Sequence, residues 1–143
     1  MISIGTLLYF APPKYASGVE NIEHKKRIMV VVDINLKDNT LLLINISSVK
    51  GKARCFTYKY NYLIKNFNPP LPIESFAKLN DNYIIENNIL INNYVYNNGT
   101  KLNESELINI IIEKADYAEK NKIEQIKFTY LEIEYFNSKL IST

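Results

Sequence analysis

The 143-residue sequence predicts an α+β protein that consists mainly of β-strands and has a long amphipathic helix toward its C-terminal end. Residues 2–98 contain short apolar runs rich in β-branched and aromatic residues, and polar turns separate these runs. From Asn103 onward, apolar residues recur at the three- and four-residue spacing of a helix, over about residues 103–121. Because no linker or repeat divides the chain, we expect a single domain over residues 1–143.

The first predicted elements are a strand and a long loop. Residues 2–10 (ISIGTLLYF) are mostly β-branched, aromatic or apolar, which predicts a strand. This strand ends at Pro12 and Pro13, because proline has no N–H group to donate to a sheet. Residues 14–26 are mostly polar and include the pair Ser17-Gly18, which is typical of an exposed loop.

A β-hairpin is predicted next, over residues 28–48. Residues 28–34 (IMVVVDI) and 40–48 (TLLLINISS) are two nearly continuous apolar runs, which suit central strands buried on both faces. Residues 37–39 (KDN) supply the turn that joins the two strands.

The middle of the chain predicts further strands around an extended connection. Residues 54–64 (RCFTYKYNYLI) are aromatic and alternate imperfectly, while residues 66–72 contain three prolines and predict an extended segment. Two short strands are predicted over residues 82–86 and 89–96. A turn at residues 97–99 (NNG) follows them.

The C-terminal part of the chain contains two capping signals and one strand signal. Asn103, followed by a glutamate three residues later, marks the start of the long helix. Residues 123–128 (IEQIKF) predict a last strand. Thr129 repeats the capping pattern and predicts a short terminal helix, although the alternation of residues 131–135 fits a strand almost as well.

The composition excludes several classes of protein. Apolar residues make up 47% of the chain and charged residues 22%, which is ordinary for a protein with a packed core. Cys55 is the only cysteine, so no intrachain disulfide can form and a reducing compartment fits best. The sequence has neither an apolar run of membrane-spanning length nor a signal-peptide pattern, so we expect a cytoplasmic protein with no membrane partner.

Residue types that hold metals and nucleotides are sparse. His24 is the only histidine, and with a single cysteine it leaves no set of metal ligands at a usual spacing. The four glycines stand singly at positions 5, 18, 51 and 99, so no phosphate-binding glycine loop is recognisable. We therefore expect neither a metal nor an organic cofactor.

Basic residues are concentrated in the first part of the chain. Residues 1–60 contain nine Lys and Arg against four Asp and Glu, whereas residues 61–143 contain eight against eleven. A basic surface attracts phosphate-bearing partners, but charge alone does not distinguish RNA from DNA, a nucleotide or a membrane headgroup. A solvated basic surface without any ligand fits this distribution as well.

The two ends of the predicted hairpin are polar. The run His24-Lys25-Lys26-Arg27 enters the first strand, and Ser47-Ser48-Val49-Lys50-Gly51-Lys52 leaves the second. Because paired strands lie ~5 Å apart, Arg27 and Ser47 are predicted to be neighbours. A guanidinium, two hydroxyls and several ammonium groups at one edge suit a phosphodiester, although the solvated ends of two strands explain the same residues.

These residues resemble a family of toxin ribonucleases. The segment from Gly5 through Tyr9-Phe10, the strand opening Arg27-Ile28-Met29-Val30-Val31-Val32 and the strand end Ile46-Ser47-Ser48 resemble PemK/MazF/Kid-like toxins. The stretch Ser47-Ser48-Val49-Lys50 is similar to a motif of the related ToxN-like branch. The resemblance covers about residues 3–86.

The resemblance implies a small SH3-like β-barrel and a metal-independent endoribonuclease of a toxin-antitoxin or phage-defence system. In such an enzyme the ribose 2′-hydroxyl of single-stranded RNA attacks the adjacent phosphorus. The resemblance implies a catalytic group of Arg27, Ser47 and Lys50 and a set of RNA-binding residues: His24, Lys25, Lys26, Ser48, Lys52 and Arg54. It also implies a homodimer and a cognate antitoxin, either an acidic peptide or a structured RNA.

Two departures from the family pattern leave an alternative open. Ile28 stands where the family usually has proline after the arginine, and Ser47 stands where it has threonine. Serine keeps the hydroxyl, so the second change is chemically mild. The alternative function is a catalytically inactive module, such as a phage or mobile-element inhibitor, that binds nucleic acid or protein with the same barrel.

Overall fold

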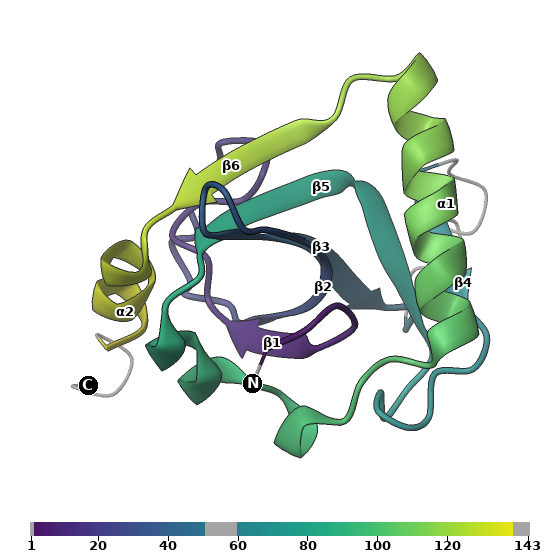
Figure 1. The fold of residues 1–143 in the computed structure, drawn as a ribbon, viewed down its shortest axis with the longest axis horizontal. Coiled ribbons are helices and arrows are strands. Elements are labelled where there is room, and N and C mark those ends of the chain that lie inside the picture. Colours follow the sequence, from purple (N-terminus) through teal and green to yellow (C-terminus); the bar gives the residue numbers. More distant parts are fainter. Residues whose placement is uncertain (1, 51–59, 139–143) are drawn as a thin grey trace.

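The computed structural model describes residues 2–50 and 60–138, which form a curled six-stranded sheet flanked by helices (Figure 1). The protein is therefore an α+β structure made mainly of strands, as predicted. The elements in chain order are β1 (Leu7–Phe10), β2 (Arg27–Asn35), β3 (Thr40–Ser48), β4 (Asn61–Ile64), β5 (Ser75–Glu86), η2 (Ile89–Tyr94), η3 (Asn97–Gly99), α1 (Glu104–Lys120), β6 (Glu124–Phe128) and α2 (Tyr130–Ser138).

The sheet is antiparallel except at one strand. Its order is β1-β2-β3-β5-β4, and β6 pairs in parallel with the second half of β5. Within the described residues, no pairing joins β1 to β4, so the sheet is curled but not closed. In Figure 1, α1 lies along one side of the curled sheet and α2 lies at the other.

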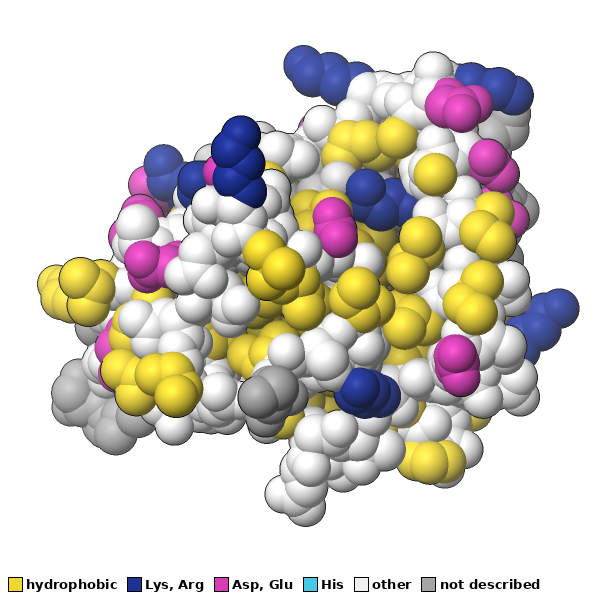
Figure 2. Space-filling view, in the orientation of Figure 1, with side chains coloured by type: hydrophobic (Ala, Val, Ile, Leu, Met, Phe, Trp, Pro, Cys, Tyr) yellow, Lys and Arg dark blue, Asp and Glu magenta, His cyan; other side chains and the backbone are white. Residues whose placement is uncertain are grey.

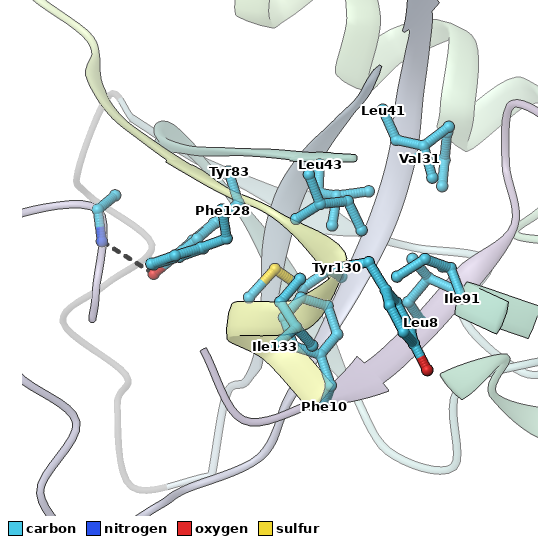
Figure 3. Close-up of a cluster of buried hydrophobic side chains, with 13 residues drawn as sticks. Leu8, Phe10, Val31, Leu41, Leu43, Tyr83, Ile91, Phe128, Tyr130 and Ile133 are labelled. Atoms are coloured by element: carbon cyan, nitrogen blue, oxygen red, sulfur yellow. Dashed lines mark hydrogen bonds between the residues drawn. The ribbon is translucent and has the colours of Figure 1, made fainter. Parts of the chain in front are cut away.

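The predicted hairpin is confirmed as β2 and β3. Ile28 lies opposite Ile46, and the pairing continues to Asn35 opposite Thr40 beside the turn. Alternate side chains of both strands enter two apolar clusters on the two faces of the sheet. Figure 3 shows the first cluster, in which side chains of β1, β2, β3 and β5 meet Phe128, Tyr130 and Ile133. Burial on both faces explains why these strands are nearly continuous apolar runs.

Strand β5 is long and bent. Ile44 of β3 lies opposite Asn82, but Ile46 lies opposite Ala77, so residues 78–81 form an irregularity opposite Asn45. The bend allows the first half of β5 to pair with β4 and the second half to pair with β6. The predicted strand over residues 82–86 is thus only the second half of a 12-residue strand.

Three of the strands predicted from the sequence need correction. Strand β1 begins at Leu7 rather than residue 2, because the chain turns at Gly5, whose φ is +97°. The predicted strand over residues 89–96 is wrong, since the Asn88 side chain accepts a hydrogen bond from the Leu90 N–H and starts the 3-10 helix η2. In the predicted strand 54–64 only residues 61–64 are seen as a strand, and residues 51–59 lie outside the described residues.

Helix α1 confirms the predicted long helix and its cap. The Asn103 side chain accepts hydrogen bonds from the N–H groups of Ser105 and Glu106. The buried Glu106 carboxylate accepts hydrogen bonds from the Tyr62 hydroxyl at 2.7 Å and from the Asn66 N–H at 3.2 Å, which ties the helix to β4 and the loop after it.

Part of the apolar surface of α1 remains exposed. Ile110 is buried against the sheet, while Ile108, Ile111 and Ile112 are exposed. Figure 2 shows such hydrophobic side chains gathered on the face that contains α1 and its border with the sheet. The helix therefore uses only one stripe of its apolar residues for packing.

Helix α2 confirms the predicted terminal helix, and the alternative strand over residues 131–135 is wrong. Thr129 and Glu132 form a reciprocal capping box, because each backbone N–H donates to the side chain of the other residue. The buried Asn137 side chain donates to the Ala11 carbonyl at 2.9 Å and accepts from the Ala11 N–H at 2.8 Å. These two bonds fix α2 to the chain just beyond β1.

We expect Asn137→Ala to lower the free energy of unfolding by about 2–3 kcal/mol, because both Ala11 backbone groups lose their partner in a buried position. Urea titration monitored by circular dichroism measures this loss of unfolding free energy. The matched control is Asn92→Ala, since Asn92 is exposed and bonds only within its own short helix. A loss for Asn137→Ala no larger than for Asn92→Ala would contradict this role of the Asn137 side chain.

Candidate functional site

Arg27 and Ser47 lie at the same end of the β2–β3 hairpin. They are the next residues outward from Ile28 and Ile46, which lie directly opposite each other. Residues that extend an antiparallel pairing in this way share one face of the sheet. The structure therefore brings together the two residues that the hairpin prediction placed side by side, although Ser47 is buried and only 6% exposed.

Two cavities adjoin Arg27, and Arg27 and Tyr15 line both of them. The inner cavity has a volume of about 310 Å³ and reaches from the loop before β2 to the bend of β5. Its lining is Tyr15, Ser17, Val19, Arg27, Asn45, Lys78, Asp81 and Tyr83. The outer cavity has a volume of about 390 Å³ and is lined by Tyr15, Glu20, Ile22, Glu23, Lys25 and Arg27. Ser47 lines neither cavity.

The Arg27 guanidinium is held against an aromatic ring. Its Cζ atom lies 5.3 Å from the centre of the Tyr15 ring, within the range of a cation–π contact. The Tyr15 hydroxyl donates a hydrogen bond of 2.8 Å to the Asn21 side chain. Asn21 is buried and also bonds to the backbone of Pro12 and Lys25, so the loop before β2 has a fixed shape. The same loop therefore holds the Tyr15 ring that contacts Arg27.

The inner cavity contains charges of both signs. Burial raises the pKa of the Asp81 carboxyl above its ordinary value, and the repulsion by Glu124 adds to this, while Lys78 and Arg27 act in the opposite direction. Burial also raises the pKa of Tyr83 to about 12. The Tyr83 hydroxyl accepts a hydrogen bond from the Ala16 N–H at 3.0 Å, drawn as the dashed line in Figure 3.

Asn45 is a buried amide side chain of the inner cavity. It is 4% exposed, and its Oδ1 atom has no hydrogen-bond partner. It faces the irregular segment of β5, where the regular ladder between β3 and β5 is interrupted. The Oδ1 atoms of Asn80 and Asn82 are likewise buried without a partner, although neither residue lines the cavity.

Other residues predicted to bind RNA are spread around the hairpin end. His24 stacks on Phe136 of α2 with ring centres 4.0 Å apart, so its ring is engaged by α2. Lys25 lines the outer cavity and pairs with Glu23 at 3.1 Å. The Lys26 ammonium lies 5.5 Å from the centre of the Tyr9 ring.

The remaining predicted residues lie elsewhere or outside the described part of the chain. Ser48 is the last residue of β3, opposite Ser75. Lys50 lines a separate cavity with Val49, Ile73 and Glu74, so the structure does not bring it into the cavities beside Arg27. Lys52 and Arg54 lie outside the described residues.

Sequence reasoning missed most of the inner cavity. Asn45 was detectable, because it is a polar residue inside an apolar run that predicts a buried strand. Lys78 and Asp81 reach the site only because β5 bends, and no local pattern marks that bend.

None of the helices in the described part of the chain has the length and apolar character that a membrane crossing requires.

We expect Asp81→Asn to stabilise the protein more at neutral than at acidic pH. Burial raises the pKa of Asp81, so the folded state holds this proton more tightly, and stability falls as the pH rises through the raised pKa. An asparagine side chain does not ionise, so the variant does not lose this stability as the pH rises. Melting temperatures of Asp81→Asn and the wild type, measured at about pH 7 and about pH 3, give the comparison, with Asp116→Asn on the exposed face of α1 as control. If the melting temperature of Asp81→Asn differed from that of the wild type by the same amount at both pH values, the raised pKa of Asp81 would be contradicted.

Comparison with known proteins gives this chain no family. No protein-family model matches the sequence, and no curated protein matches it. The resemblance of the hairpin ends to PemK/MazF/Kid-like toxins therefore stays a prediction that rests on residues of this chain.

Proposed function

We propose that the protein is a metal-independent endoribonuclease that cleaves single-stranded RNA at Arg27. The observation that supports this most directly is the position of Arg27 between two open cavities at the end of the hairpin, against the Tyr15 ring. A guanidinium in that position can hold a phosphodiester while the nucleotides on its two sides occupy the two cavities. The likeness to toxin ribonucleases at the same residues agrees with this proposal.

The chemistry that suits these residues is transesterification within the RNA. The ribose 2′-hydroxyl loses its proton as its oxygen attacks the adjacent phosphorus, the bond to the 5′-oxygen of the next nucleotide breaks, and that oxygen takes up a proton. The products are a 2′,3′-cyclic phosphate and a free 5′-hydroxyl. Arg27 stabilises the negative charge that develops on the phosphoryl oxygens, and the Lys78 ammonium adds positive charge in the same cavity.

The other basic groups near the hairpin end extend the RNA-binding surface. Lys25 and Lys26 lie beside the outer cavity and the Tyr9 ring, where they can contact the phosphates of flanking nucleotides. The Ser47 hydroxyl is buried and lines neither cavity, so in this proposal it acts on the substrate only by orienting Arg27, its neighbour on the paired strand. As part of this proposal, the curled sheet is an open variant of the SH3-like barrel, and a cognate antitoxin neutralises the enzyme.

We expect Arg27→Ala to reduce RNA cleavage by about 100-fold or more, because the developing charge loses its main stabilising group. The assay incubates mixed single-stranded RNA with the protein in EDTA and maps the ends of the products. Ser47→Ala is tested in the same way, and we expect a smaller loss. Growth arrest on expression in bacteria gives a second readout for both variants.

The matched control is Lys37→Ala, which also removes one positive charge but lies in the turn at the opposite end of the hairpin. Circular dichroism establishes that each variant is folded. Folded Arg27→Ala and Ser47→Ala proteins that cleave RNA as well as the wild type would overturn the assignment of the site. Absence of cleavage by the wild type would overturn the enzymatic function itself.

A further inference from the structure

The Arg27 guanidinium has no ionic partner in the described part of the chain. Within residues 2–50 and 60–138, no carboxylate forms an ion pair with it, and none of the guanidinium N–H groups donates a hydrogen bond. Asp81 lines the inner cavity together with Arg27, yet these two described residues do not form an ion pair. The N–H groups of the guanidinium therefore stay available to a ligand.

The contact that the structure shows for this guanidinium is with an aromatic ring. The Arg27 Cζ atom lies over the Tyr15 ring, 5.3 Å from its centre. A ring attracts a guanidinium through its π-electrons, whereas a carboxylate binds the paired N–H groups of the guanidinium. A phosphate needs the same paired N–H groups, so a carboxylate in this position would compete with it. The Tyr15 ring can hold the cation without this competition.

Tyr15 is itself held by three hydrogen bonds of the loop before β2. Its hydroxyl donates to the Asn21 side chain at 2.8 Å, and Asn21 is buried. Its backbone N–H donates to the Val19 carbonyl, and its carbonyl accepts from the Gly18 N–H, both at 2.8 Å. Because the hydroxyl is bonded to a buried amide, the part of Tyr15 that acts on Arg27 is the ring.

We propose that Tyr15 is a positioning residue, whose ring holds the Arg27 guanidinium beside both cavities with its N–H groups open to a phosphodiester. This inference rests on the proposed RNA-cleaving function. A guanidinium that is in place before the RNA binds does not have to be ordered as charge develops on the phosphoryl oxygens. Loss of the ring leaves the positive charge present, so it slows the chemical step more than it weakens binding.

The first test measures cleavage of a single-stranded oligoribonucleotide that contains a site mapped with the wild type. Tyr15→Leu is expected to lower kcat about tenfold and to change KM less than about twofold. Tyr15→Phe keeps the ring and is expected to keep most of the wild-type kcat, since Asn21 Oδ1 still accepts from the Lys25 N–H. The control is Tyr117→Leu in α1, which lines neither cavity and is expected to leave both constants unchanged.

A double-mutant cycle distinguishes action through Arg27 from a direct contact with the RNA. In an Arg27→Ala background there is no guanidinium to hold, so adding Tyr15→Leu is expected to change kcat less than about twofold. A further tenfold loss in that background would mean that Tyr15 acts independently of Arg27, and it would overturn the positioning role.

Nuclear magnetic resonance tests the contact without RNA. The chain has two arginines, Arg27 and Arg54, so two Nε–Hε signals are expected, and Arg27→Ala identifies the signal of Arg27. The magnetic field of the Tyr15 ring is expected to shift this signal in the wild type and in Tyr15→Phe. In Tyr15→Leu the signal is expected to return toward the ordinary position of an arginine, while Tyr117→Leu leaves it unchanged.

The two readouts separate a failure of this inference from a failure of the nuclease. If the wild type cleaves RNA but Tyr15→Leu leaves kcat or the Arg27 signal unchanged, the positioning role is overturned and the nuclease stands. If the wild type does not cleave RNA, the nuclease is overturned, and so is a role of Tyr15 in cleavage, even where the spectra show the contact.

Discussion

Pairing of β2 with β3 is the constraint on which the rest of the structure depends. Both strands are buried on both faces, and their alternate side chains supply the two apolar clusters of the protein. A shift of the register by one residue would move every side chain to the other face. The same register that builds the core therefore places Arg27 beside Ser47 and turns Asn45 toward the cavity.

The bend of β5 converts this hairpin end into a site. In a regular strand, a single residue of β5 would lie opposite Asn45 and continue the ladder. The irregularity at residues 78–81 instead brings a lysine and an aspartate to the edge of the cavity, and Tyr83 then returns to the core. Asn45, at the interruption of the ladder, is buried and lines the same cavity.

The segments on either side of the hairpin hold this arrangement in place. The loop before β2 is fixed by Asn21, whose side chain bonds to the backbone at two points and to Tyr15. Helix α2 bonds to Ala11 through Asn137 and stacks Phe136 on His24 of the same loop.

The sequence by itself determined the elements whose signals are local. Apolar runs predicted the hairpin, and capping residues predicted the starts of α1 and α2, because these patterns act within a few residues. It also predicted that Arg27 and Ser47 are neighbours, since the ends of a tight hairpin must be adjacent. Only the tertiary structure decided that residues 75–81 continue β5 and that Lys50 lies apart from Arg27. Those features depend on contacts between residues far apart in the chain, such as β5 with β3, and no local pattern encodes such contacts.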